Sequence, residues 1–390
     1  MMSKTEERLL QAVAEFGSRA ADRAQEIEAA RRMPLDLVEA MRALGLFRMF
    51  VPAELGGMEL TVPASLPILE ALAAADASTA WLAMQGHHAA VLPTRLPRAS
   101  YAAIYANGAD VIWANSLVPG GAAEVVPGGY QVSGRWPFAS GCQHADWIFA
   151  ICMTTRNGQP APSPSPGPPP LRGVVLPARD WTVQDTWRAE GLKGTGSCHI
   201  ALADVFVPEA STFPMFGGES TFAGPLYQWT MLVLPFQFAA IAVGIARGAI
   251  NDLSALARSG KTYLFAHEGL KDSTVFHHEL GRAEAELLAA SALLHEQAGV
   301  TWSRAVSGHL DDADAVRGAQ VRTWVAAACA RVVDLCFTLG GGSSVYDESP
   351  LQRRLRDVHA VTQHATLNQR QYAFAGAVLA GHPARNPLGG

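Results

Sequence analysis

Residues 130–147 carry side-chain types that suit a flat, dry binding slot. Apolar residues alternate with polar or small ones as far as Phe138, which predicts a strand with one buried face, and Gly141 then breaks the pattern. Trp136 and the hydroxyl of Ser140 lie near the end of this predicted strand. An aromatic ring beside one hydrogen-bonding hydroxyl would accept a flat cofactor. An ordinary core strand of a β-barrel explains the same pattern, so the residues alone leave both interpretations open.

Other groupings of reactive residues are poor matches to known chemistry. Ser140, His144 and Asp146 are the types of a hydrolase triad, but they lie within seven residues and no nucleophile elbow surrounds them. The adjacent histidines at 277–278 have no further ligands at metal spacing, so no metal site is predicted. The glycines of residues 191–196 lack the strand–loop–helix context of a phosphate loop and predict a turn of the β-domain.

The composition provides a large core and excludes several classes of protein. Of the 390 residues, 49% are apolar and 17% charged, and the net charge is −5 without a basic block, which argues against nucleic acid as a partner. Five cysteines form no disulfide framework and indicate a reducing cytoplasm. The N-terminus does not resemble a signal peptide, and the most apolar run, residues 231–246, is too short to span a bilayer comfortably.

The period of the apolar residues changes twice along the chain. Residues 1–110 predict helices, and residues 111–222 predict short antiparallel strands with an exposed, proline-rich hairpin insertion at 154–170. Residues 223–390 predict a bundle of four long helices, at 229–256, 273–307, 311–339 and 351–379. These helices are apolar on more than one face, which predicts an oligomer.

This layout resembles the acyl-CoA dehydrogenase superfamily, and three motifs carry the resemblance. LKGTGSCHIALADVFVPEA at 192–210 is similar to the barrel segment of that family, and GIARGAI at 244–250 to its first bundle helix. LGGGSSVYDESPLQRRLRDVHAVTQH at 339–364 is similar to its glycine turn and arginine–aspartate helix. The resemblance implies an acyl-CoA dehydrogenase-like fold: an N-terminal all-α domain (1–110), a central β-barrel domain (111–222) and a C-terminal four-helix bundle that also forms the oligomer (223–390).

The dehydrogenases of that family need a carboxylate base, which this chain lacks at the matching positions. His364 and Ala365 stand where the Tyr and the Glu of the usual motif fall, and Leu234 and Pro235 stand at the alternative position. The chain resembles instead the oxygenase components of two-component flavin monooxygenases. The matching motifs are GHH at 86–88, ANS at 114–116, WPFASG at 136–141 and the histidine eight residues past the arginine.

The resemblance implies roles for individual residues. Ser140 would hydrogen-bond the flavin nitrogen beside the C4a carbon, Trp136 would wall the isoalloxazine, His364 would assist formation of a C4a-hydroperoxyflavin, and His88 would deprotonate the substrate. For each of these side chains a structural role also explains the position: a turn for Ser140, a helix cap for His88, and an interhelical contact for His364.

The same resemblance implies less specific roles for further residues. Asn115 or Ser116 would help to hold the flavin or the peroxide, and Gly341 and Gly342 would let the flavin of a neighbouring subunit approach the backbone. A shift of the alignment by eye would put His87 in place of His88, or His359 in place of His364. Trp229, Met231, Phe236 and Phe238 are available to line a pocket formed by the N-terminal helices, the loop at 217–224 and the first bundle helix.

The implied function is that of an oxygenase component. It would take reduced FMN or FAD, bound non-covalently, from a separate NAD(P)H-dependent flavin reductase and use O₂ to oxygenate a phenolic, polycyclic or indole-like substrate, as a homotetramer. Two alternatives stay open from the residues alone. One is a flavin oxidase or acyl-CoA dehydrogenase-like enzyme with an unplaced base, and the other is a protein that kept the fold without flavin.

Overall fold

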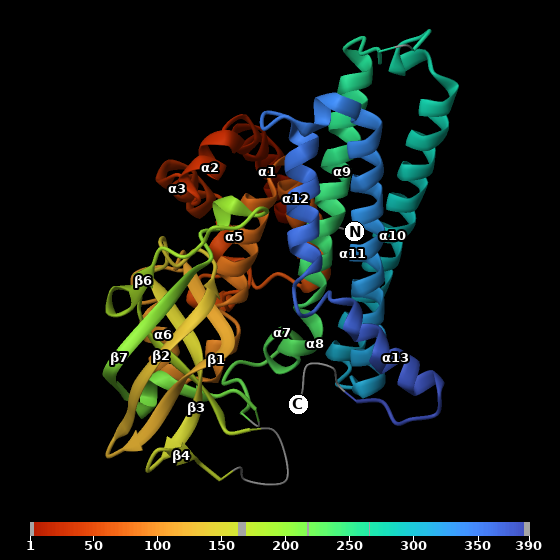
Figure 1. The fold of residues 1–390 in the computed structure, drawn as a ribbon. Coiled ribbons are helices and arrows are strands. Elements are labelled where there is room, and N and C mark those ends of the chain that lie inside the picture. The colour runs from red at the N-terminus through yellow and green to blue at the C-terminus, as the bar shows by residue number, and fades with distance from the viewer. Residues whose placement is uncertain (1–3, 163–168, 217, 265, 386–390) are drawn as a thin grey trace.

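Helices, then strands, then long helices follow one another along the chain of this computed structural model, which describes residues 4–162, 169–216, 218–264 and 266–385. The N-terminal helices are α1 (Lys4–Asp22), α2 (Ala24–Ala30), α3 (Leu35–Ala43), α4 (Val62–Ala75), α5 (Ala77–His88) and α6 (Arg98–Ile104). Asp76 caps α5, because its carboxylate accepts the backbone N–H of Thr79 at 2.7 Å. Helix α5 contacts both the sheet and the long helices, so it lies where the three groups of elements meet (Figure 1).

The eight strands form one curled sheet around its own apolar core. They are β1 (Trp113–Val126), β2 (Gly129–Ala139), β3 (Trp147–Arg156), β4 (Gln159–Pro160), β5 (Leu171–Pro177), β6 (Thr182–Gln184), β7 (Cys198–Pro208) and β8 (Thr212–Pro214). Within the described residues the path runs β6-β7-β2-β1-β3-β5-β8, so the expected barrel is realised as an open sheet. The prediction of a wholly antiparallel sheet is wrong for one pair, because β1 and β3 run parallel with Trp113 opposite Trp147.

The proline-rich insertion is described only in part. Strands β3 and β4 form a short hairpin whose turn, at Asn157 and Gly158, is exposed, as the sequence predicts for a surface insertion. Residues 163–168 of the insertion lie outside the described residues.

The C-terminal group contains the predicted long helices, with interruptions in the first, at Leu234 and Pro235, and in the fourth. Its elements are α7 (Pro225–Gln228), α8 (Thr230–Val233), α9 (Phe236–Arg258), α10 (Thr274–Val306), α11 (Asp312–Gly340), α12 (Pro350–Thr362) and α13 (Tyr372–Leu379). The prediction of one continuous fourth helix is wrong, because α12 ends at Thr362 and α13 begins at Tyr372. Side chains in the break hydrogen-bond the nearby backbone instead, as Asn368 does with the N–H of Arg370 at 2.9 Å. The break places His364 in a turn.

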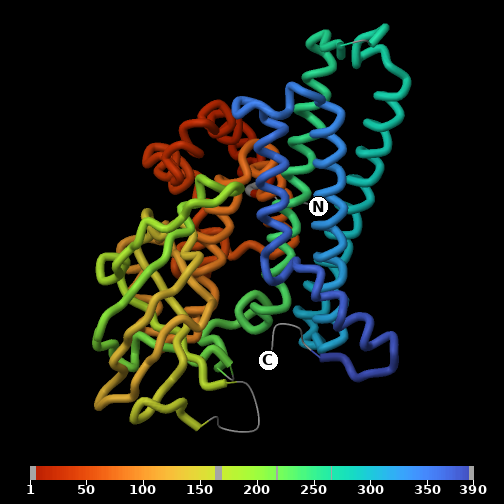
Figure 2. The backbone as a smooth tube through the Cα atoms, viewed as in Figure 1, coloured from red at the N-terminus to blue at the C-terminus, as the bar shows by residue number. Residues whose placement is uncertain are grey.

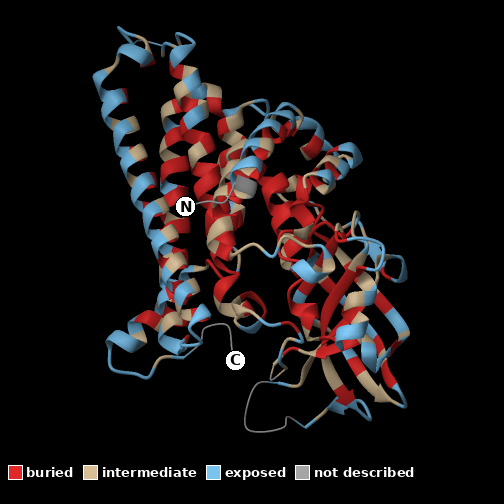
Figure 3. Ribbon diagram, turned by 180° about the vertical axis from the view of Figure 1, so that it is seen from behind, coloured by how far each residue is buried: buried red, intermediate tan, exposed pale blue. Residues whose placement is uncertain are grey.

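Helix α9 is enclosed by the rest of the molecule. The run Thr230–Arg258 is long and apolar enough to cross a membrane, longer than the sequence suggested, but 94% of its most apolar window is buried inside the protein. The second run of this kind, Asp312–Val345, is only half buried. Figure 3 shows that α10, at the edge of the bundle, keeps one side exposed along its length. Apolar residues such as Leu288 and Val300 lie on that exposed side, a pattern in keeping with the predicted oligomer, which stays a prediction.

Buried charges hold α12 against the N-terminal helices, which lie beside it in the backbone trace (Figure 2). The guanidinium of Arg354 pairs with Asp252 at 3.1 Å and donates to the carbonyls of Ala73 and Ala74 at 3.0 and 2.6 Å. This side chain is 4% exposed. These contacts fix the position of α12 along α4, and so they position the turn that follows α12.

Candidate active site

Four rings from two helices, α5 and α9, and from the turn after α12 meet beside the sheet. Phe238, on α9, stacks on His364 with ring centroids 3.9 Å apart and lies 5.5 Å from His88. Trp81 lies edge-on to His364 at 5.7 Å and tilted to Phe238 at 5.4 Å. Trp81 and His88 are seven residues apart on α5, two helical turns, so both face α9. We call these four residues the ring cluster.

Ser140 joins the ring cluster to the sheet. The indole N–H of Trp81 donates to the Ser140 hydroxyl at 3.1 Å. Ser140 lies in the turn after β2, where Gly141 adopts a φ of +73° and its N–H donates to the carbonyl of Thr195 at 2.9 Å. The Ser140 hydroxyl also lies 2.7 Å from that of Ser197. The structure therefore brings Ser140, His88 and His364 to one place, as the sequence predicts.

His364 has a defined tautomer in this environment. The backbone N–H of Thr366 donates to Nδ1 of His364 at 3.4 Å, and the Thr366 hydroxyl lies 2.9 Å from the same atom. Because an N–H can only donate, Nδ1 is an acceptor, and we infer that the proton of the neutral ring is on Nε2. Burial lowers the pKa of His364 to about 4, so the imidazole is neutral at pH 7. It offers one N–H donor.

His88 is neutral and has no hydrogen-bond partner for its buried Nδ1 among the described residues. Burial, together with the neighbouring imidazoles of His87 and His364, lowers its pKa to about 3. A buried polar atom without a partner is costly, and such atoms are often found where a ligand binds. Nδ1 of His88 is therefore available to accept a hydrogen bond from a bound molecule.

The two alternative histidines do not join the ring cluster. His87 is fully buried between Leu46, whose carbonyl accepts from Nδ1 at 3.1 Å, and Gln237, whose amide nitrogen lies 3.0 Å from Nε2. It is a core histidine with both nitrogens satisfied. His359 lies on the exposed side of α12 and contacts Asp334 at 2.8 Å.

The prediction that Trp136 walls a bound flavin is wrong. Its indole is fully buried in the core of the sheet, donates to the carbonyl of Ile151 at 2.7 Å and packs edge-on against Trp181. The register of β2 against β7 shifts between Trp136 and Ala139, so Phe138, predicted on the buried face, is 61% exposed with a φ of +62°. The tryptophan beside Ser140 is Trp81. Its spacing to His88 on a predicted helix is the signal in the sequence for it.

The remaining predicted binding residues lie at different distances from the ring cluster. Ser116 uses its hydroxyl within the sheet, where it donates to the carbonyl of Pro137 at 2.7 Å. Its neighbour Asn115 points to the other face of β1 and makes no side-chain hydrogen bond to a described residue. Gly341 ends α11 with a φ of +60° against the ring of Tyr263, and Gly342 has open space where a Cβ would lie. Both glycines are at the far end of α12 from His364, roughly 20 Å along the helix.

No carboxylate among the described residues hydrogen-bonds or forms an ion pair with a member of the ring cluster. Of the residues that the resemblance puts at the base positions of the dehydrogenases, Ala365, Leu234 and Pro235, none carries a carboxylate, and Leu234 is buried. The nearest acidic group of α12, Asp357, is used elsewhere, because its carboxylate accepts the backbone N–H of Leu192 at 2.7 Å. The arrangement offers neutral imidazoles and hydroxyls rather than a carboxylate base.

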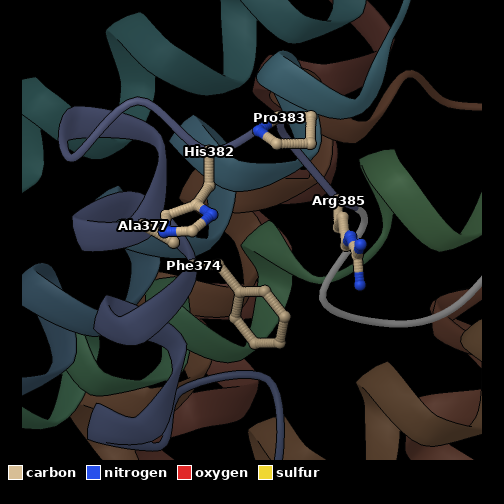
Figure 4. Close-up of a pocket in the computed structure, with 5 residues that line it drawn as sticks. All are labelled: Phe374, Ala377, His382, Pro383 and Arg385. Atoms are coloured by element: carbon tan, nitrogen blue, oxygen red, sulfur yellow. The ribbon is translucent and has the colours of Figure 1, made fainter.

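Pockets at the surface lie apart from this place. Figure 4 shows a pocket of about 280 Å³ between α13 and the segment that follows it, lined by Phe374, Ala377, His382, Pro383 and Arg385. A second, of about 400 Å³, lies over α10 around His295 and Arg304. Neither contains a residue of the ring cluster.

The residues around Ser140 fit an isoalloxazine ring. Aromatic faces, the hydroxyl of Ser140, an N–H donor on His364 and the unpartnered Nδ1 of His88 lie together without a charged group. These are the groups that bind a flat, weakly polar ring system. Within the described residues no group of three or more His, Cys, Asp or Glu side chains is placed to hold a metal ion.

Known proteins match most of this chain. The acyl-CoA dehydrogenase N-terminal domain matches residues 3–97, and the C-terminal domain matches residues 236–369. Indole-3-acetate monooxygenase from Pseudomonas putida is 32% identical over 95% of this chain and 92% of its own length. The oxygenase subunit HsaA of a flavin-dependent monooxygenase from Rhodococcus jostii is 29% identical over 94% and 97%. The structure of XiaF from a Streptomyces species, in complex with FADH2 and glycerol, superimposes with a TM-score of 0.90 at 25% identity, covering 97% of this chain and 96% of XiaF.

The chain belongs to the acyl-CoA dehydrogenase superfamily, in its branch of flavin-dependent monooxygenase oxygenase components. Within that branch it is a flavin-dependent monooxygenase.

Proposed function

We propose that this protein is the oxygenase component of a two-component system that transfers one oxygen atom from O₂ to an aromatic substrate. The observation that carries the proposal is the ring cluster beside Ser140, which contains two neutral imidazoles and no carboxylate. A dehydrogenase on this fold would need a general base, and the positions for it hold Ala365 and Leu234. This absence weighs against the dehydrogenase alternative.

Three side chains carry the proposed chemistry. When bound, reduced flavin supplies the electrons that activate O₂ for oxygen transfer. Ser140 holds the ring by its hydroxyl, Phe238 and Trp81 exclude water, and the Nε2–H of His364 donates a hydrogen bond into the site. His88, neutral at pH 7, accepts a proton from the substrate.

The flavin is FMN or FAD, bound non-covalently and delivered in its reduced form by a separate NAD(P)H-dependent reductase. XiaF, whose structure contains FADH2, supports the use of reduced flavin. Asn115 faces away from the sheet core and is available to the flavin. Gly341 and Gly342 lie far from the ring cluster of their own chain, so within a homotetramer they would serve the flavin of a neighbouring subunit.

The substrate is an aromatic molecule of the indole or phenol type. Relatives over most of this chain are indole-3-acetate monooxygenases from Pseudomonas putida and Acinetobacter baumannii and the p-hydroxyphenylacetate 3-hydroxylase oxygenase component of Acinetobacter baumannii. The predicted pocket residue Phe238 is in the ring cluster and would stack on a planar substrate.

Oxygen labelling tests this function. The protein is mixed with chemically reduced FMN or FAD, ¹⁸O₂ and either indole-3-acetate, a phenol or a polycyclic aromatic, and the products are analysed by mass spectrometry. We expect a product that gains one ¹⁸O atom. His277→Asn, an exposed histidine far from the ring cluster, should behave as wild type. Reduction of bound oxidised flavin by an acyl-CoA, with no labelled product, would overturn the proposal in favour of a dehydrogenase.

A further inference from the structure

Three hydroxyl groups form a continuous hydrogen-bonded chain behind Ser140. Ser140 Oγ lies 2.7 Å from Ser197 Oγ, which lies 2.7 Å from Thr195 Oγ1. The chain ends on the carbonyl oxygen of Leu192, 2.9 Å from Thr195 Oγ1. At its other end the indole N–H of Trp81 donates to Ser140. All three hydroxyl-bearing residues are buried.

The hydrogen bond from Thr195 to the Leu192 carbonyl fixes the direction of the other two hydroxyl hydrogen bonds. A carbonyl oxygen can only accept, so Thr195 donates its single hydroxyl hydrogen to Leu192. Thr195 must then accept from Ser197, and Ser197, with its hydrogen used, must accept from Ser140. The hydroxyl hydrogen of Ser140 therefore points into the protein.

The Leu192 carbonyl is a firm end point for this chain. It also accepts the backbone N–H of Thr195 at 3.1 Å and the indole N–H of Trp187 at 3.1 Å. Leu192 itself adopts a φ of +53° and donates its own N–H to the buried Asp357. The carbonyl therefore stays in place as an acceptor.

We propose that Ser197 and Thr195 are positioning residues that make Ser140 a pure acceptor toward the ligand, so that the site selects a flavin in its reduced state. This inference rests on the proposed function. Ser140 accepts one hydrogen bond from Trp81, and its second lone pair is free. The ring nitrogen that flanks the oxygen-reacting carbon of a flavin carries an N–H in the reduced ring and a bare lone pair in the oxidised ring. Only the reduced ring offers Ser140 a donor.

The selectivity explains how an oxygenase component would favour the form that its reductase delivers. An oxidised ring would bring a lone pair against the lone pair of Ser140 and leave both without a hydrogen. An unmade hydrogen bond at a buried site changes an affinity by roughly tenfold. Ser197 and Thr195 act on this preference through Ser140 alone.

The test is the ratio of the affinities for oxidised and reduced flavin, measured without O₂. Wild-type protein and variants are titrated anaerobically with FMN and FAD in both states, and the reduction potential of the bound flavin is read from the same samples. Wild type should bind the reduced form more tightly. Ser197→Ala frees the Ser140 hydrogen to turn toward the ligand, and the preference should fall roughly tenfold. By linkage this lowers the potential of the bound flavin by about 30 mV for two electrons.

Two further variants separate this effect from damage to the fold. Thr195→Val should lower the preference as Ser197→Ala does, because Ser197 loses its acceptor, and Thr195→Ser should restore it. Ser133→Ala is the matched control, because it removes a hydroxyl of β2 that takes no part in the hydrogen bonds between Ser140, Ser197 and Thr195. An unchanged ratio in both Ser197→Ala and Thr195→Val would overturn the inference and leave the proposed function intact. If wild type binds neither form of flavin, the proposed function itself fails.

Discussion

The ring cluster and the charged contacts of α12 are neighbours in the chain but opposite in character. Just after α12, His364 stacks on Phe238 in a site without carboxylates. Within α12, Arg354, Arg356 and Asp357 are partly or fully buried and each has a polar partner. The Arg356 guanidinium pairs with Glu28 at 2.8 Å and donates to the carbonyl of Glu190 at 2.5 Å.

The difference separates positioning from chemistry. Buried ion pairs add little net stability but impose one geometry, because an alternative packing would leave a charge unpaired. Here the ion pairs tie α12 to α9 and α2, and hydrogen bonds from Arg356 to the Glu190 carbonyl and from the Leu192 N–H to Asp357 tie it to the loop before β7, so His364 is held relative to Ser140. The ring cluster contains no charged group that would draw water into it. Removing a side chain from the charged contacts of α12 should therefore lower the free energy of unfolding more than removing one from the ring cluster.

Arg354→Met should give the largest loss of stability. The change leaves Asp252 and the carbonyls of Ala73 and Ala74 without their donor, and breaking a buried pair in this way costs about 3–5 kcal/mol. Urea unfolding measures the difference in the free energy of unfolding. Arg179→Met, which removes an exposed guanidinium, is the control and should change it by less than about 0.5 kcal/mol. Equal stabilities of the two variants would contradict this view of α12.

The two regions should respond to pH with opposite signs. Burial raises the pKa of Asp357 to about 7, so the folded protein keeps a proton that the unfolded chain releases above pH 4, and this contribution to stability falls as pH rises from 4 to 7. Burial lowers the pKa values of His88 and His364, in the ring cluster, to about 3 and 4, so the unfolded chain binds more protons below pH 6.5. Their contribution is lost as the pH falls toward 4.

Asp357→Asn isolates these opposing slopes. The amide oxygen can still accept the N–H of Leu192, while the titrating carboxyl is gone. Between pH 4 and 7 the free energy of unfolding of the variant should rise more steeply than that of wild type, by on the order of 4 kcal/mol over the range. Chemical unfolding at several pH values measures both curves. Parallel curves would show that Asp357 is ionised in the folded protein throughout.

His88→Asn tests the chemistry of the ring cluster. The variant keeps a polar side chain of similar size but cannot take a proton from the substrate, and we expect product formation to fall about a hundredfold. Oxygen consumption with reduced flavin should persist, because the contacts that we propose for Ser140 and His364 with the flavin remain. His277→Asn is the matched control. A variant that turns over at the wild-type rate would restrict His88 to a structural role.

The order of the elements could be predicted from the sequence because the apolar period changes from helix to strand and back. The site was predicted in part. Ser140, His88 and His364 lie together, but the tryptophan that meets Ser140 comes from 59 residues earlier in the chain, so local pattern favoured Trp136 instead. Two features could not be predicted from the apolar period. The shift in register that turns Phe138 outward depends on how β2 pairs with β7, and the end of α12 at Thr362 depends on side-chain hydrogen bonds in the turn that follows.

Ser140→Ala should have the smallest of these effects and is the most specific probe of the ring cluster. The change removes one acceptor, and the indole N–H of Trp81 and the Ser197 hydroxyl lose their partner. We expect the binding free energy of reduced flavin to weaken by about 1 kcal/mol. We expect hydrogen peroxide release per flavin oxidised to rise roughly fivefold relative to product, with a small loss of stability because the buried indole N–H of Trp81 loses its acceptor. Ser133→Ala, on the same strand but exposed, should leave the ratio of peroxide to product unchanged. If both variants couple as well as wild type, the polar atom that joins the ring cluster to the sheet has no part in the reaction.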